Sequence, residues 1–119
     1  MKFGILFLFF STTLLAANSE SEAIRRTVRS HLSEVKNCYA SAMKKNPGLK
    51  GKMVLDWDVN DKGAVTKAAL NEKKSTLNNE DVTKCITEKL MGWKFPAAEV
   101  GKTISVSYPF DFSNWALKK

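Results

Sequence analysis

The stretch from Ser75 to Phe112 constrains this chain most, because its hydrophobic pattern changes period once within a single segment. One set of apolar residues has helical spacing and the next set alternates: Leu77, Val82, Cys85, Ile86 and Leu90, then Ile104, Val106, Tyr108, Phe110 and Phe112. The first set predicts an amphipathic helix that stops near Trp93, and the second predicts an aromatic-rich strand from Lys102 to Phe112. Proline cannot donate to an inner ladder, so Pro109 predicts that this strand lies at an edge or a bend.

The residues before this segment are expected to supply the surface against which it packs. Apolar residues in steps of three and four predict a first helix from about Glu22 to Lys45. Alternation then predicts a strand over Met53 to Val59, turn chemistry at Asn60 to Gly63, and a second strand over Ala64 to Leu70. The predicted fold class is therefore α+β, in the order α-β-β-α-β.

The first 19 residues have the features of a secretory signal peptide. Lys2 precedes a short apolar run from Phe3 to Leu15, and the small residues Ala17 and Ser19 suit a cleavage site. An uncleaved membrane anchor is the alternative interpretation. We therefore expect a signal peptide over 1–19, one domain over 20–113 and a short basic tail over 114–119, and we expect the mature chain to be periplasmic or secreted.

The chain is basic, with 19 lysines and arginines against 12 acidic residues. Its formal charge of +7 becomes +6 if Lys2 leaves with the signal peptide. The lysines are spread through apparent loops rather than interleaved with aromatic residues, which argues against nucleic acid as a partner. A solvated surface explains the charge, and an anionic envelope polymer or an acidic protein is the electrostatic partner that it favours.

Cys38 and Cys85 are the only cysteines, and each lies on the predicted apolar face of a different helix. Because the signal peptide directs the chain to an oxidising compartment, we predict that the two form a disulfide. Two buried free thiols are the alternative. The close spacing of a catalytic Cys-x-x-Cys site is absent.

No residue pattern predicts catalysis or metal binding, so the chain is interpreted as a non-enzyme without cofactors. Asp56 to Gly63 superficially resembles the start of a calcium loop, but Asp61 stands where glycine is needed and Lys67 where a bidentate glutamate belongs. Alternation instead predicts that Asp56 and Asp58 lie on the solvated face of a strand. His31 is the sole histidine and is expected on a helix surface.

Six aromatic residues fall in or near the predicted strands and the loop before the last of them: Trp57, Trp93, Phe95, Tyr108, Phe110 and Phe112. Core packing is the expected role for most of them. Trp93 and Tyr108 have polar edges and are the two that we expect to reach the surface.

The ordered set of these features resembles the C-terminal domain family of TonB, and more closely its AgmX/PglI-type branch of bacterial envelope proteins. The matching residues, in chain order, are Cys38-Tyr39, Pro47-Gly48-Leu49-Lys50-Gly51, the hairpin Val54 to Val65 with Gly63, Val82, Cys85, Leu90, Trp93-Lys94-Phe95-Pro96 and Tyr108-Pro109-Phe110-Asp111-Phe112. They cover about Ile24 to Phe112, nearly all of the expected mature chain.

The resemblance implies a small three-stranded antiparallel sheet with two helices packed on one face, in a periplasmic domain that binds envelope proteins. TonB-type domains pair an extended peptide with the edge of the last strand. Here that edge would consist of Thr103, Ile104, Ser105, Val106, Ser107 and Tyr108. Members of the family usually carry a membrane helix and a proline-rich spacer, whereas this signal peptide is followed almost directly by the first helix. A free adaptor is therefore expected, rather than an energy transducer.

Two further functions stay open at this point. The basic charge is compatible with a domain that binds an anionic cell-wall polymer or a lipopolysaccharide surface. The same strand edge is compatible with self-association into a homodimer.

Overall fold

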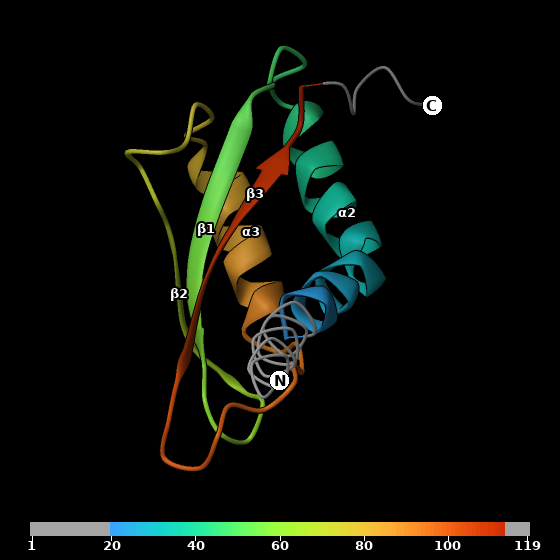
Figure 1. The fold of residues 1–119 in the computed structure, drawn as a ribbon. Helices are drawn as coiled ribbons and strands as arrows, with labels where there is room; N and C mark the ends of the chain where they lie inside the picture. The colour runs from blue at the N-terminus through green and yellow to red at the C-terminus, as the bar shows by residue number, and fades with distance from the viewer. Residues whose placement is uncertain (1–19, 114–119) are drawn as a thin grey trace, which may run out of the picture.

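A computed structural model of the chain describes residues 20–113, and the expected signal peptide and basic tail lie outside the described residues. Its sheet has three antiparallel strands, β1 (Lys52–Val59), β2 (Val65–Leu70) and β3 (Ile104–Asp111), in the order β2-β1-β3. The helices α2 (Leu32–Met43) and α3 (Glu80–Leu90) pack together on one face of this sheet (Figure 1). The predicted α+β class and element order are therefore confirmed.

Alternation along β1 places one row of side chains in the core. Met53, Leu55, Trp57 and Val59 are buried beneath the helices, with exposed fractions of 1% or less. Val54 belongs to the opposite row, for which the sequence predicts exposure, yet it is also buried. The loop after β2 runs along β1 at this point, because the Asn71 N–H donates to the Val54 carbonyl at 2.8 Å and the Ser75 hydroxyl accepts from the Val54 N–H at 2.9 Å. The main-chain groups of Val54 are thus satisfied by this loop rather than by β2 itself.

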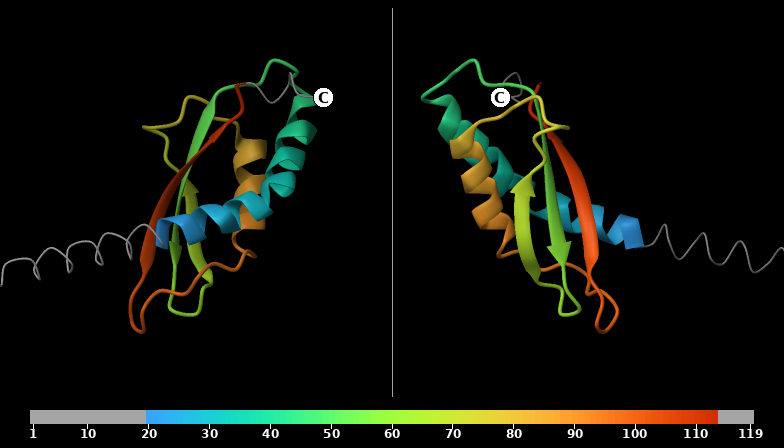
Figure 2. Two further views of the ribbon diagram at one scale, coloured as in Figure 1. Left: turned by 45° about the vertical axis from the view of Figure 1, so that its right-hand side comes forward. Right: turned by 90° about the vertical axis from the view of Figure 1, so that its left-hand side faces the viewer.

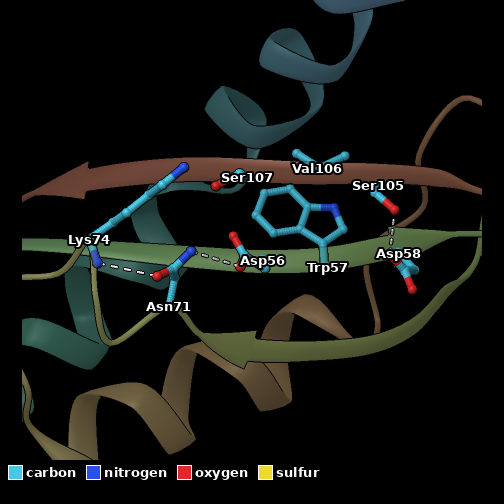
Figure 3. Close-up of a pocket in the computed structure, with 8 residues that line it drawn as sticks. All are labelled: Asp56, Trp57, Asp58, Asn71, Lys74, Ser105, Val106 and Ser107. Carbon is cyan, nitrogen blue, oxygen red and sulfur yellow. Dashed lines mark hydrogen bonds between the residues drawn. The ribbon is translucent and has the colours of Figure 1, made fainter.

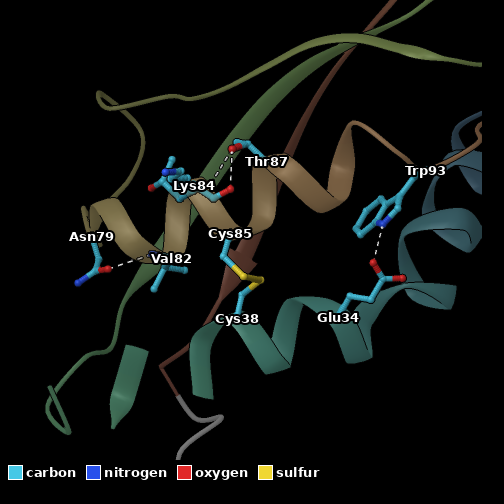
Figure 4. The surroundings of a disulfide bond; sticks show 9 residues. Glu34, Cys38, Asn79, Val82, Lys84, Cys85, Thr87 and Trp93 are labelled. Carbon is cyan, nitrogen blue, oxygen red and sulfur yellow. Dashed lines mark hydrogen bonds between the residues drawn. A yellow bond between two sulfur atoms is a disulfide. The ribbon is translucent and has the colours of Figure 1, made fainter. Parts of the chain in front are cut away.

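α3 is an amphipathic helix with a side-chain cap. The Asn79 side chain accepts a hydrogen bond from the Val82 N–H at 3.0 Å, which satisfies one of the free donors at the helix start. Val82, Ile86 and Leu90 form its buried face, as the spacing predicts. The sulfur atoms of Cys85 in α3 and Cys38 in α2 are joined in a disulfide with a Cα–Cα distance of 5.7 Å (Figure 4). This crosslink connects the two helices across their packed interface.

The single long helix expected from Glu22 to Lys45 is wrong in one respect, because it is interrupted at His31. Residues 20–30 are helical, His31 adopts φ −113° and ψ 11°, and α2 then begins at Leu32. The interruption changes the direction of the chain, so that residues 20–30 extend toward β3 (Figure 2). This direction lets Val28 be fully buried and Ile24 pack against the core. Burial of these side chains is a physical reason for the bend.

Gly63 closes the turn between β1 and β2 and also contacts the chain that leads to β3. Its φ of +79° lies in the left-handed region, which favours glycine. Its carbonyl accepts the Phe95 N–H at 2.9 Å, and a Cβ at this position would overlap the Phe95 carbonyl oxygen. The approach of two backbone segments therefore requires glycine here.

Candidate partner-binding edge

β3 forms one edge of the sheet and is paired with a neighbour on one side. It pairs with β1 over its whole length, from Lys52 opposite Asp111 to Val59 opposite Ile104, without a shift in register. Within residues 20–113 no strand lies on its other side. β3 is therefore an edge strand, as Pro109 predicts.

The hydrogen bonds at the end of β3 show which main-chain groups point outward. The Phe112 N–H donates to the Gly51 carbonyl at 2.7 Å, directly beyond the Lys52–Asp111 pair. Because hydrogen-bonded and non-hydrogen-bonded pairs alternate in an antiparallel ladder, the main-chain groups of Ile104, Val106, Tyr108 and Phe110 face β1. Those of Ser105, Ser107 and Pro109 face away from the sheet. Within residues 20–113 no hydrogen bond engages the outward groups of the two serines.

Of the six residues predicted at this edge, five lie in β3 and Thr103 lies immediately before it. Ser105 and Ser107 present both an N–H and a carbonyl to the free side. Ile104, Val106 and Tyr108 use theirs on β1 and place half-buried side chains on the helix-covered face. The predicted segment therefore divides into two serines that offer backbone groups and three apolar residues that offer side chains.

Helical residues 20–30 begin close to β3, and in the right-hand view of Figure 2 they lie on the side of β3 away from β2. A groove of about 280 Å³ separates them from the strand. We call it the edge groove, and its lining residues are Glu20, Ser21, Ile24, Arg25, Ile104, Ser105, Val106, Ser107 and Tyr108. It has an apolar side formed by Ile24, Ile104, Val106 and Tyr108, and Arg25 contributes a positive charge. The free backbone groups of β3 thus lie along a groove rather than on a flat surface.

A second hollow lies on the face of the sheet that the helices leave uncovered (Figure 3). Asp56 and Asp58 lie there opposite Ser107 and Ser105, half-buried as the alternation of β1 suggests. Their carboxylates are mostly engaged: Asp58 accepts from the Ser105 hydroxyl at 2.9 Å and lies 3.8 Å from the Lys67 ammonium, and Asp56 accepts from the Asn71 amide at 3.0 Å. Two buried polar atoms of the lining, Asp56 Oδ1 and Trp57 Nε1, have no hydrogen-bond partner within residues 20–113.

The bend at His31 is held by contacts with Trp93. The two rings stack at a centroid distance of 4.4 Å, and Glu34 accepts hydrogen bonds from the Trp93 indole N–H at 3.2 Å and from His31 at 2.9 Å (Figure 4 shows the Trp93 bond). These hydrogen bonds, first that from His31 and then that from Trp93, lower the pKa of the Glu34 carboxyl below its ordinary value. The expectation of a surface position is wrong for Trp93, which is 3% exposed. His31, whose side chain is 28% exposed, and Tyr108 are both half-buried and reach the surface in part.

The edge groove is the feature that sequence reasoning missed. The predicted strand edge consists of β3 alone, whereas Ile24 and Arg25 come from a helix about 80 residues earlier in the chain. The only signal for their role is that Ile24 begins the apolar stripe of the first helix. Nothing in the spacing marks His31 as the residue at which that stripe turns.

Two negative observations concern residues 20–113 alone. No group of three or more histidine, cysteine or acidic side chains is placed there to hold a metal ion. In the same part of the chain, no helix has the length and apolar character needed to cross a membrane.

Comparison with known proteins yields a structural similarity but no family. No family model matches the sequence, and no curated protein matches it either. Among solved structures, the chain is similar to the NMR structure of the TonB C-terminal domain from Helicobacter pylori, with 22% sequence identity and a TM-score of 0.45. The match covers 79% of this chain and 92% of the other. Membership of the TonB C-terminal domain family accordingly stays a prediction from the sequence.

Proposed function

We propose that this domain binds an extended segment of an envelope protein, which adds as a fourth strand beside β3. The observation that carries the proposal is the pair of outward-facing serines, whose N–H and carbonyl groups have no partner within residues 20–113. Strand addition satisfies such groups by main-chain hydrogen bonds and leaves selectivity to the side chains. The resemblance of the sequence to TonB-type domains supports the same mode of binding.

The cellular setting of the proposal comes from the sequence. A cleaved signal peptide over 1–19 would deliver the domain to the periplasm or the outside of the cell, where the Cys38–Cys85 disulfide is stable. In that compartment the domain would act as an adaptor without an enzymatic activity or a cofactor. A place in the AgmX/PglI-type branch belongs to the same proposal.

The test replaces one outward-facing residue by proline on each edge of the sheet. Ser107→Pro removes an outward N–H from β3 and leaves the β1–β3 ladder intact. Ala68→Pro is the matched control: the Asn71–Val54 bond and the register of β2 place the Ala68 N–H on the outer side of β2. We expect Ser107→Pro to abolish capture of partners from an oxidised envelope extract and Ala68→Pro to leave it unchanged, with circular dichroism confirming both folds.

Two results would contradict strand addition at β3. Unchanged capture by both Ser107→Pro and Ser105→Pro would show that the free backbone groups are not used. A concentration-dependent shift to a dimer on gel filtration, lost in Ser107→Pro, would show that the edge serves a second copy of this chain instead of an envelope protein.

A second candidate function is binding to an anionic cell-wall polymer or lipopolysaccharide, which the formal charge favours: +7 for the full chain, and +6 once Lys2 leaves with the signal peptide. Such binding depends on many exposed charges and should weaken strongly with added salt. Main-chain hydrogen bonds along β3 should be comparatively insensitive to salt. A salt titration of partner binding therefore distinguishes the two functions.

A further inference from the structure

The edge groove is asymmetric, and we infer that it selects an extended acidic segment with apolar side chains at alternate positions. The inference rests on the proposed strand addition and specifies which peptides β3 would accept. It concerns the helical residues 20–30, of which Glu20, Ser21, Ile24 and Arg25 form the second side of the groove.

An added strand would present two different faces to the domain. Successive side chains of a strand point to opposite faces of the sheet. Side chains on the helix-covered face of a strand beside β3 would enter the edge groove, next to Ile24, Val106 and Tyr108. Because these three residues are half-buried and apolar, apolar side chains of the peptide would extend the existing core and remove further apolar surface from water.

The opposite face of the added strand would meet different chemistry. There β3 contributes Ser105, Ser107 and Pro109, which are exposed and short. Their neighbours on β1, Asp56 and Asp58, are engaged with Asn71, Ser105 and Lys67. Peptide side chains on this face would remain largely in solvent, so polar residues are acceptable there. The selected pattern is therefore apolar at every second position and unrestricted between them.

The charge requirement comes from the helical side of the groove. Arg25 is exposed and lines the groove, and Arg29 follows one helical turn later on the same side of the helix. Glu20 is the one acidic lining residue and lies at the opposite end of the helical segment from Arg29. With the excess positive charge of the chain, this arrangement attracts an acidic peptide and disfavours a basic one.

The test uses synthetic probes, because no natural partner is identified. One fluorescein-labelled peptide begins with two aspartates followed by alternating valine and threonine, and a second begins with two lysines and is otherwise identical. We expect the purified chain to bind the acidic probe about tenfold more tightly than the basic probe at low salt. A third probe, with an N-methyl group on every amide of the alternating segment, has no main-chain donor for the ladder on either edge and should not bind.

Variants in helical residues 20–30 test which side chains determine the preference for the acidic probe and for valine in the probe. Arg25→Glu should reduce the preference for the acidic probe at least fivefold, whereas Arg26→Glu makes the same charge change on a residue that does not line the groove and should reduce it less than twofold. Ile24→Ala should reduce the preference for valine over alanine in the probe by about fivefold. Circular dichroism establishes that each variant is folded.

The results separate this inference from the proposed function. Equal binding of the acidic and basic probes, or equal effects of Arg25→Glu and Arg26→Glu, would overturn the role of the groove, while the N-methyl probe and Ser107→Pro would still report on strand addition. Failure of the acidic probe to bind at all would also overturn the inference. Binding of the N-methylated probe would instead contradict strand addition itself.

Discussion

The two edges of this sheet differ in regularity, although both are formed by antiparallel partners of β1. β2 has six residues and its register shifts between Asp58 and Val59, whereas β3 has eight residues in continuous register. A bulge increases the local twist and makes an edge a poor template for another strand. β3 has no such irregularity and lies along the edge groove. The comparison indicates that one sheet can keep one edge unsuitable for pairing and the other suitable for it.

The largest expected effect is a loss of stability of the whole domain, including both edges of the sheet, when the disulfide is removed. Replacing Cys38 and Cys85 by alanine removes a crosslink between residues 47 positions apart and should lower the free energy of unfolding by up to about 4 kcal/mol. Urea denaturation of the native and double-variant proteins measures the difference. The mass of the native chain should rise by two daltons on reduction, and an unchanged mass would show that the thiols are free.

Moving a proline by one residue along β3 sharpens the comparison between inward- and outward-facing groups. Val106→Pro removes an N–H that faces β1 and should lower the free energy of unfolding by about 3 kcal/mol. Ser107→Pro removes an N–H that faces outward and should change it by less than about 1 kcal/mol. Urea denaturation of both variants measures the contrast. Equal losses would show that the assignment of inward and outward groups is wrong.

A pair of glycines tests the connection that leads into β3. Gly63 and Gly101 both have positive φ, but only at Gly63 would a Cβ meet another part of the backbone. Gly63→Ala should therefore cost about 2–3 kcal/mol, and Gly101→Ala about 1 kcal/mol from conformation alone. Thermal unfolding of the two variants provides the comparison. Similar losses would mean that the contact between Gly63 and Phe95 adds nothing to the stability.

The smallest effect concerns the bend at His31, which directs residues 20–30 toward β3, and it depends on pH. The Glu34 pKa is lowered in the folded chain by hydrogen bonds from His31 and Trp93. The stabilisation is therefore present above the unfolded pKa and is lost as the pH falls through the folded value, below about pH 4.5. The melting temperature of the native chain should fall more steeply on acidification than that of Glu34→Gln. If the melting temperatures of the two proteins depended on pH in the same way, Glu34 would not be responsible for the loss of stability at low pH.

The sequence predicts the elements of this fold better than their environments. Helical spacing and alternation place α3 and β1 to within a few residues, because one buried face is enough to define each period. They do not predict the bend at His31, since the apolar stripe continues through it. The burial of Trp93 depends on Glu34, the main-chain partners of Val54 come from the loop after β2, and both contacts join residues distant in the sequence.

The candidate site was predictable in position and not in detail. Pro109 and the alternation of the last strand predict an edge, but the side on which Ser105 and Ser107 present their backbone groups depends on the register with β1. That register is a property of the assembled sheet. The contribution of Ile24 and Arg25 depends in turn on the direction that the chain takes after His31.

Pro109 also has a consequence for polymerisation between copies of this chain. An unpaired edge strand can lead to polymerisation, because each molecule that adds to the assembly presents its own unpaired edge to the next molecule. Pro109 leaves a missing donor on the outer side of β3, two residues beyond Ser107, and so limits the run over which a guest can be held. A short peptide can pair within that run. If many copies of the chain paired edge to edge along the whole of β3, each junction between copies would lack the hydrogen bond that Pro109 cannot donate.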